Sequence, residues 1–327
     1  MVRNPIFDRA RGIGMLLVIY GHMFHGIPFA FIFSFHMPLF FIMSGMLISE
    51  NKIKLPYKEW KKHIIKKYIP PIVFFSIFGG IVNVLFFKTP DFRIMCKDFF
   101  LHMSSDELLT GAIWFLSMLG FVMLLMPLLV QIQQKVKWGG HIFTVVLSIA
   151  AFLLSKIPFT LPFLIKTIPT ALLFVYLGYT YKKSLLQLIN NNNVKRSCIF
   201  ILPIFILLVI FNRTVNIAVP VYNDFFVYLI CSLYGTIMTL QISTYKMSKF
   251  IEYIGKQSLI VFSLHAIWIT TFVQVINNLL CEDYRPMVDL PFSYVLFGGI
   301  IVTVLTAINT ALIAPIYNLF LRIIRIK

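Results

Sequence analysis

The feature that most constrains this chain is a series of apolar runs, each about 20 residues long, that recur from one end to the other. A run of that length crosses roughly 30 Å of hydrocarbon as an α-helix. Of the 327 residues, 59% are hydrophobic and only 13% are charged. A water-soluble domain with this balance would expose large apolar patches. We therefore predict an all-α, polytopic transmembrane helix bundle that uses residues 1–327 as a single domain.

The apolar runs predict about ten membrane helices, with both ends of the chain on one side. We place the helices at residues 10–31, 35–50, 68–87, 112–133, 141–155, 161–181, 197–212, 219–243, 257–279 and 292–321. Proline suits the first turn of a helix. His36-Met37-Pro38 and Pro70-Pro71 therefore indicate where the second and third helices begin.

The basic residues predict the orientation of the bundle. The chain has a formal charge of +17, but its Lys and Arg lie in short loops between apolar runs. A nucleic-acid binder would gather them on one soluble face, so we predict the lipid bilayer as a partner and no nucleic acid. Of the 29 Lys and Arg, 22 lie near the termini and in alternate loops, against six in the other loops. The positive-inside rule then places both termini in the cytoplasm.

A row of ionisable residues follows the first predicted helix. Steps of three and four residues place the members on one helical face: Asp8, Arg11, Met15, Val18, His22 and His25. Arg11 and His22 are separated by about 16 Å along the axis. Ionisable groups at membrane depth are costly and normally face the bundle interior or a cavity. The row predicts a polar channel. The alternative is a structural network in which the histidines bond to neighbouring helices.

Two further segments extend this pattern. A short connection should bring His36, at the start of the second helix, towards the level of His22 and His25. Seven lysines surround Trp60 between Asn51 and Lys67. This segment is either a surface helix on anionic headgroups or a cradle for a polyanionic donor, in which Lys62, Lys66 and Lys67 would bind phosphates. The four cysteines show no CxxC spacing, and we predict no metal site.

Several motifs together resemble one protein family. The segment Asp8 to His22, the run His36-Met37-Pro38-Leu39-Phe40-Phe41 and the pair Ser44-Gly45 are similar to the start of the membrane-bound acyltransferase-3 family, in particular its fucose 4-O-acetylase-like branch. Later landmarks follow in the same order: Ile113-Trp114-Phe115-Leu116, Tyr176-Leu177-Gly178-Tyr179, and Ile254-Gly255-Lys256-Gln257-Ser258-Leu259 ending at His265.

The resemblance implies acyl transfer, usually of acetyl, from cytoplasmic acyl-coenzyme A (acyl-CoA) to a hydroxyl of a cell-envelope polysaccharide or its lipid-linked precursor, in the bacterial cytoplasmic membrane. His63, Lys66 and Lys67 stand where the family commonly has paired arginines, which weakens bidentate phosphate binding there.

We predict His22 as the general base, since imidazole accepts protons near neutral pH. Arg11 and His36 are the other predicted catalytic residues, and Arg11 would also hold the donor. His25, Trp114 and His265 are predicted to contact the substrate, although His265 could equally be a packing residue. Direct transfer and transfer through an acyl-histidine both remain open.

Two other functions fit the same hydropathy. A transporter or flippase for lipid-linked sugars often shows internal repeats and acidic residues at mid-membrane. Here the acids lie in loops or at helix ends, and the polar residues concentrate in the first two helices. A sensor or scaffold would leave the aligned histidines without a role. The pattern therefore favours an enzyme.

Overall fold

The chain folds into a bundle of helices. The computed structural model describes residues 4–87, 91–103, 113–280 and 290–324. In these ranges, β-structure is limited to one isolated bridge between Asn216 and Val221. The helices are α1 Pro5–Gly21, α2 Gly26–Phe33, α3 His36–Met46, α4 Glu50–Ile53, α5 Tyr57–Phe86, α6 Phe92–His102, α7 Trp114–Lys135, α8 Gly139–Ser155, the 3₁₀-helix η3 Pro162–Thr167, α9 Ile168–Thr180, α10 Lys182–Asn190, α11 Asn192–Asn212, α12 Phe225–Ile242, α13 Lys249–Lys256, α14 Ser258–Leu280 and α15 Phe292–Ile323.

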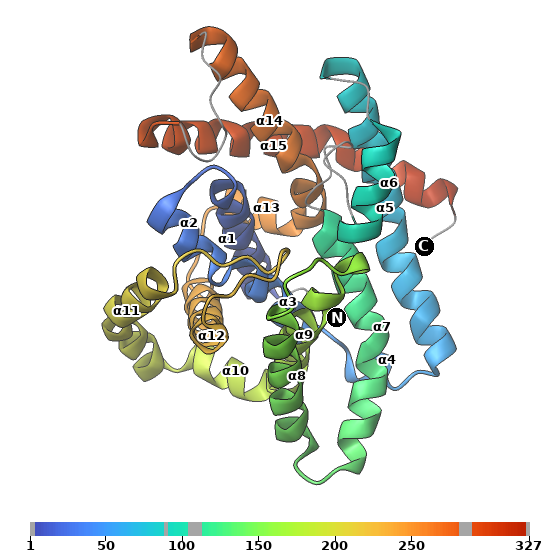
Figure 1. The fold of residues 1–327 in the computed structure, drawn as a ribbon, viewed down its shortest axis with the longest axis vertical. Coiled ribbons are helices and arrows are strands. Elements are labelled where there is room, and N and C mark those ends of the chain that lie inside the picture. Colours follow the sequence, from blue (N-terminus) through green and yellow to red (C-terminus); the bar gives the residue numbers. More distant parts are fainter. Residues whose placement is uncertain (1–3, 88–90, 104–112, 281–289, 325–327) are drawn as a thin grey trace.

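The predicted all-α membrane bundle is confirmed. Within the described ranges, eight helical segments are long and apolar enough to cross a membrane, α2 and α3 counting together as the segment Gly26–Met46. The shorter α8 and the partly charged α1 occupy two more of the ten predicted positions. In Figure 1, α1, α3 and α13 lie near the middle, between α11 and α12 on one side and α5 and α7 on the other.

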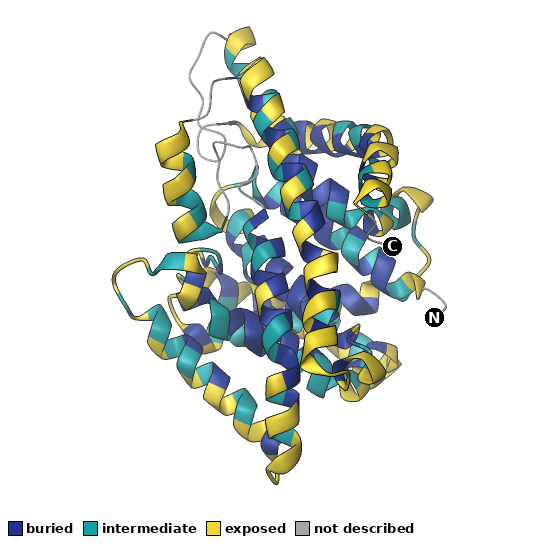
Figure 2. Cartoon of the chain, turned by 90° about the vertical axis from the view of Figure 1, so that its right-hand side faces the viewer, coloured by how far each residue is buried: buried dark blue, intermediate teal, exposed yellow. Residues whose placement is uncertain are grey.

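Apolar side chains cover much of the outside of the bundle. Figure 2 shows buried residues along the middle of the bundle and exposed residues on its outer helix faces. On α11, Phe200 is 80% exposed and Phe211 is 73% exposed. Such a surface is stable against lipid tails and would aggregate in water. The outer faces therefore identify the parts of the bundle that contact the bilayer.

The first predicted helix, residues 10–31, is wrong as a continuous element. α1 ends at Gly21, and α2 begins at Gly26 after a turn. Gly26 has φ +63° and Pro28 follows it, and this combination interrupts a helix because only glycine adopts positive φ without strain. Hydropathy alone misses the break, since the residues around it remain apolar.

The predicted start of the third helix is also wrong. α5 begins at Tyr57, and Pro70 and Pro71 lie inside it. Proline lacks the N–H that would bond four residues back, yet membrane helices tolerate it where neighbouring helices support the backbone. The basic segment predicted as a loop is therefore largely the first part of α5.

Glycines set the closest helix crossings in the centre. A Cβ on Gly45 of α3 would overlap the carbonyl oxygen of Val175 in α9, and a Cβ on Gly178 would overlap that of Ile42. Gly45 and Gly178 thus let the backbones of α3 and α9 approach closely. Gly12 of α1 lies against α13 in the same way. Small residues let backbones approach closely where lipid gives no hydrophobic driving force between helices.

Candidate active site

The backbone of α1 places ionisable side chains near both of its ends. Asp8 and Arg11 lie in its first half, and His22 is the C-terminal capping residue, whose N–H bonds to the carbonyls of Val18 and Ile19 at 3.1 and 3.2 Å. The helical face predicted from Asp8 to His22 is therefore continuous. His25 does not belong to it, because it caps the start of α2 after the turn.

Three histidines from three helices gather at the His22 end. The rings of His22 and His265 of α14 have centroids 5.3 Å apart. Phe33 of α2 connects His22 to the third histidine, His36 of α3. The Phe33 ring centroid lies 6.2 Å from that of His22 and 4.7 Å from that of His36. We call His22, His36 and His265 the histidine cluster.

Backbone carbonyls fix two of these rings. His36 Nδ1 lies 2.8 Å from the Ile32 oxygen, and His265 Nδ1 lies 2.7 Å from the Phe262 oxygen. A carbonyl only accepts, so each Nδ1 carries the hydrogen, and Nε2 of each neutral ring is left with its lone pair. Both side chains are almost fully buried. His36 and His265 are therefore held in one orientation and one tautomer.

His22 differs from the other two members of the cluster. Its imidazole forms no hydrogen bond with any described residue and is only partly buried. Its contacts are ring contacts with His265 and Phe33. A histidine without a protein hydrogen-bond partner keeps both ring nitrogens available to a ligand. Of the three, His22 is the one for which neither ring nitrogen is bonded to a described residue.

Cations converge near the other end of α1. Arg11 lies 3.4 Å from the buried carboxylate of Asp8 and close enough to Lys67 and Tyr68 of α5 for its charge to act on both. Lys52 of α4 acts on Lys67 as well. The Lys67 ammonium lies 5.0 Å from the centroid of the Tyr68 ring. We call Arg11, Lys52 and Lys67 the cation cluster.

The other two predicted donor lysines lie elsewhere on α5. The core-facing side of this helix carries Trp60, Ile64 and Tyr68. At 100° per residue, Lys62 and Lys66 point to the opposite side, whereas Lys67 borders the core side. The indole of Trp60 is buried and donates to the Met123 carbonyl of α7 at 2.7 Å. Trp60 thus fastens α5 to α7 rather than reaching for headgroups.

The remaining predicted substrate residues have different surroundings. Trp114 begins α7, and its ring centroid lies 6.1 Å from that of Phe115. Phe115 contacts Phe262 at 5.4 Å, and Phe262 contacts His265 at 5.6 Å, so a chain of rings leads from Trp114 to the histidine cluster. His25 is exposed and lines a separate cavity of about 500 Å³ with residues of α2 and the start of α15.

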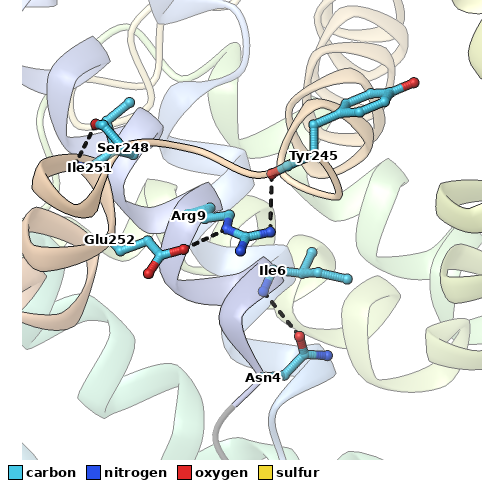
Figure 3. Close-up of polar contacts among 7 residues, drawn as sticks. All are labelled: Asn4, Ile6, Arg9, Tyr245, Ser248, Ile251 and Glu252. Atoms are coloured by element: carbon cyan, nitrogen blue, oxygen red, sulfur yellow. Dashed lines mark hydrogen bonds and ion pairs between the residues drawn. The ribbon is translucent and has the colours of Figure 1, made fainter.

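Polar contacts fasten the start of α1. Arg9 Nε donates to Glu252 of α13 at 2.8 Å, and a terminal nitrogen of Arg9 donates to the Tyr245 carbonyl at 3.0 Å (Figure 3). Asn4 caps the helix by accepting from the Ile6 N–H at 3.0 Å (Figure 3). These contacts hold α1 against the loop that joins α12 to α13 and so fix where Arg11 lies.

Sequence reasoning missed two contributors to these clusters. Phe33 links His22 to His36, but nothing marks it among the chain's 34 phenylalanines. Lys52 was counted only as one of seven lysines. Across the described ranges, no group of three or more His, Cys, Asp or Glu is placed to hold a metal ion.

Two clusters at opposite ends of a buried helix, one cationic and one of histidines, are suited to holding a polyanion and moving a proton within a membrane. A family model described as an acyltransferase domain, that of the acyltransferase-3 family, matches residues 4–311. The chain belongs to this family and is a membrane acyltransferase. No curated protein and no solved structure gives a significant match.

Proposed function

We propose that this protein is an O-acetyltransferase of the bacterial cytoplasmic membrane, similar to the fucose 4-O-acetylase-like branch. It would move an acetyl group from cytoplasmic acetyl-CoA to a hydroxyl of a cell-envelope polysaccharide or its lipid-linked precursor. The observation that carries the proposal is His22, at the end of the helix that carries Arg11, a half-buried imidazole that forms no hydrogen bond within the described part of the chain. Its setting inside an acyltransferase domain favours acyl transfer over transport.

His22 is the proposed general base. As the sugar hydroxyl attacks the thioester carbonyl, a new C–O bond forms and His22 takes the hydroxyl proton. The C–S bond then breaks, and the leaving thiolate recovers that proton from the imidazolium. His265 and His36 would support this step, because the first contacts the His22 ring, Phe33 connects the second to it, and backbone carbonyls hold both in place.

Donor binding is proposed at the cation cluster. The diphosphate and ribose phosphate of coenzyme A carry several negative charges, and Arg and Lys bind such groups through charge-assisted hydrogen bonds. Arg11 and Lys67 are close enough for their charges to act on each other. The flexible arm of coenzyme A would then extend along the Arg11 to His22 direction and bring the thioester to the histidine cluster.

Turnover by purified protein tests the proposal. The protein in lipid nanodiscs would receive acetyl-CoA and envelope glycan fragments, with release of the free thiol and the mass of the glycan as readouts. We expect an increase of one acetyl group on the glycan, matched by one thiol released. Cells lacking the protein should lose the same ester. Movement of a lipid-linked sugar across the bilayer without ester formation would contradict the proposal and support a flippase.

A further inference from the structure

A groove lies apart from both clusters, between α11 and α12. Its volume is about 440 Å³. The two helices are antiparallel neighbours, since Lys195 near the start of α11 reaches Thr244 just after α12. The lining residues are Asn192, Lys195, Arg196, Cys198, Ile199, Leu202, Met238, Gln241, Ile242 and Tyr245.

Polarity changes along this groove. The end formed by the start of α11 and the end of α12 holds Lys195, Arg196 and Gln241. One to two turns further into the bundle, the lining consists of apolar side chains, including Leu202 and Met238. A site that is cationic at the membrane boundary and apolar below it has the same polarity profile as a phospholipid.

The cationic end is already ordered. The Lys195 ammonium donates to Thr244 Oγ1 at 2.9 Å and lies 5.1 Å from the centroid of the Tyr245 ring. The Tyr245 carbonyl accepts a hydrogen bond from Arg9 (Figure 3). Neither Lys195 nor Arg196 forms an ion pair with a described residue. Among the described residues, the lining includes no acidic side chain, so two positive charges border the groove without a counter-charge from that part of the chain.

The groove also opens towards the bilayer. Ile199 is 70% exposed and Ile242 is 44% exposed, and both belong to its lining. We propose that it is a binding site for one anionic phospholipid. The headgroup phosphate would bind Lys195 and Arg196, and an acyl chain would lie along Ile199 and Leu202. Basic pockets between membrane helices bind acidic headgroups in this way.

A lipid fits this groove better than the acyl donor does. The groove is lined by lipid-exposed α11, whereas Arg11 and Lys67, which act on each other, are not among its lining residues. The lipid proposal does not depend on the proposed reaction.

Lipid retention measured by native mass spectrometry tests the site. The wild-type protein and a Lys195→Gln, Arg196→Gln variant would be titrated with phosphatidylglycerol and, separately, with phosphatidylcholine. We expect the double variant to bind one phosphatidylglycerol roughly thirtyfold more weakly and to keep its phosphatidylcholine binding. A Lys135→Gln, Lys137→Gln variant is the matched control, because it loses two exposed lysines outside the groove.

Leu202→Trp provides a second arm, because it fills the apolar part without changing charge. It should weaken phosphatidylglycerol binding, and it carries the test if the double variant does not fold. Equal losses in the control variant, or unchanged binding in Leu202→Trp, would overturn the proposal. Displacement of the bound lipid by coenzyme A or by inorganic phosphate would also overturn it and assign the groove to a soluble phosphate ligand.

Discussion

The imidazole of His22 makes ring contacts but no hydrogen bond with the residues that the structure describes, so its removal should affect chemistry more than folding. We predict that His22→Ala lowers turnover by about a hundred- to ten-thousand-fold, the usual contribution of a general base, and leaves acyl-CoA binding intact. Turnover and binding would be measured on the same purified sample. His141→Ala is the control, since His141 pairs with Tyr181, away from the histidine cluster.

Near-normal turnover in His22→Ala would contradict the assignment. His36 and His265 would then be tested. Each is tied to a backbone carbonyl through Nδ1, so His→Asn at either position removes Nε2 while its amide N–H can keep that bond, which separates loss of chemistry from loss of stability.

Substitutions of two neighbouring lysines of α5, Lys66 and Lys67, can distinguish donor binding from contact with lipid headgroups. We predict that Lys67→Gln raises the KM for acyl-CoA by about tenfold, the effect of losing one hydrogen bond to a charged group, with the acceptor KM unchanged. Lys66→Gln removes the same charge one residue away on the outer side of α5 and should change neither value. Equal effects of the two substitutions would favour a general role at the membrane surface.

Arg11 belongs to the same test. Arg11→Ala should weaken donor binding measured by calorimetry, and Arg11→Lys should restore part of it, because the charge survives while the planar fork does not. If both variants bind the donor like the wild type, the cation cluster is not the donor site.

At the residue scale, helical periodicity and the cost of burying charge predicted that Arg11 and His22 share one face of the first helix, and the structure places both on α1 and its cap. His36 was predicted near His22 from the short connection, and Phe33 links the two rings. The sequence was not sufficient to separate Lys67 from Lys62 and Lys66, because that requires knowing which side of α5 faces the core. The ring contact between His22 and His265 joins segments 243 residues apart and has no local signal.

At the scale of helices, the α3 to α9 crossing depends on two glycines. We predict that Gly45→Ala and Gly178→Ala each destabilise the protein by about 1–3 kcal/mol, because the added methyl overlaps a backbone carbonyl that cannot rotate away. Gly140→Ala, whose nearest neighbours are side-chain atoms, should cost less. Thermal unfolding in detergent measures all three, and equal losses would contradict the close-crossing explanation.

Hydropathy predicted the positions of the membrane helices, but it did not predict two of the helix boundaries. The apolar runs located the membrane helices because length and polarity determine what can cross lipid. The break at Gly26 and the extension of α5 back to Tyr57 were missed for opposite reasons. In the first case a backbone conformation interrupts an apolar run. In the second a helix continues through lysines that tolerate both water and headgroups.

For the whole molecule, contacts join loops that the prediction places on one side. Arg9 contacts the loop after α12, which Lys195 at the start of α11 contacts as well. On the other side, Thr167 of η3 donates to the Ile217 carbonyl in the loop before α12. This grouping agrees with the alternation of predicted loops, whereas the choice of side rests on the positive-inside rule.

We predict that reporter fusions after residue 327 and at Asn192 both report the cytoplasm. A fusion between Arg213 and Asn223 should report the opposite side. If both of the first two fusions reported the outer side, α8, the 17-residue helix, would not cross the membrane. Disagreement between the two would mean that one of the helices between them, α11, α12, α14 or α15, does not cross.

The contacts of Gly45 and Gly178 across the α3 to α9 crossing also affect how the stability of the bundle depends on temperature. Hydrophobic stabilisation weakens on cooling, but inside a bilayer there is no water to drive α3 and α9 together. Their crossing depends on close packing and on carbonyl dipoles set against glycine, interactions that cold does not weaken. The centre of the bundle should therefore stay assembled at low temperature. Any loss of activity at low temperature would then follow from stiffening of the surrounding lipid.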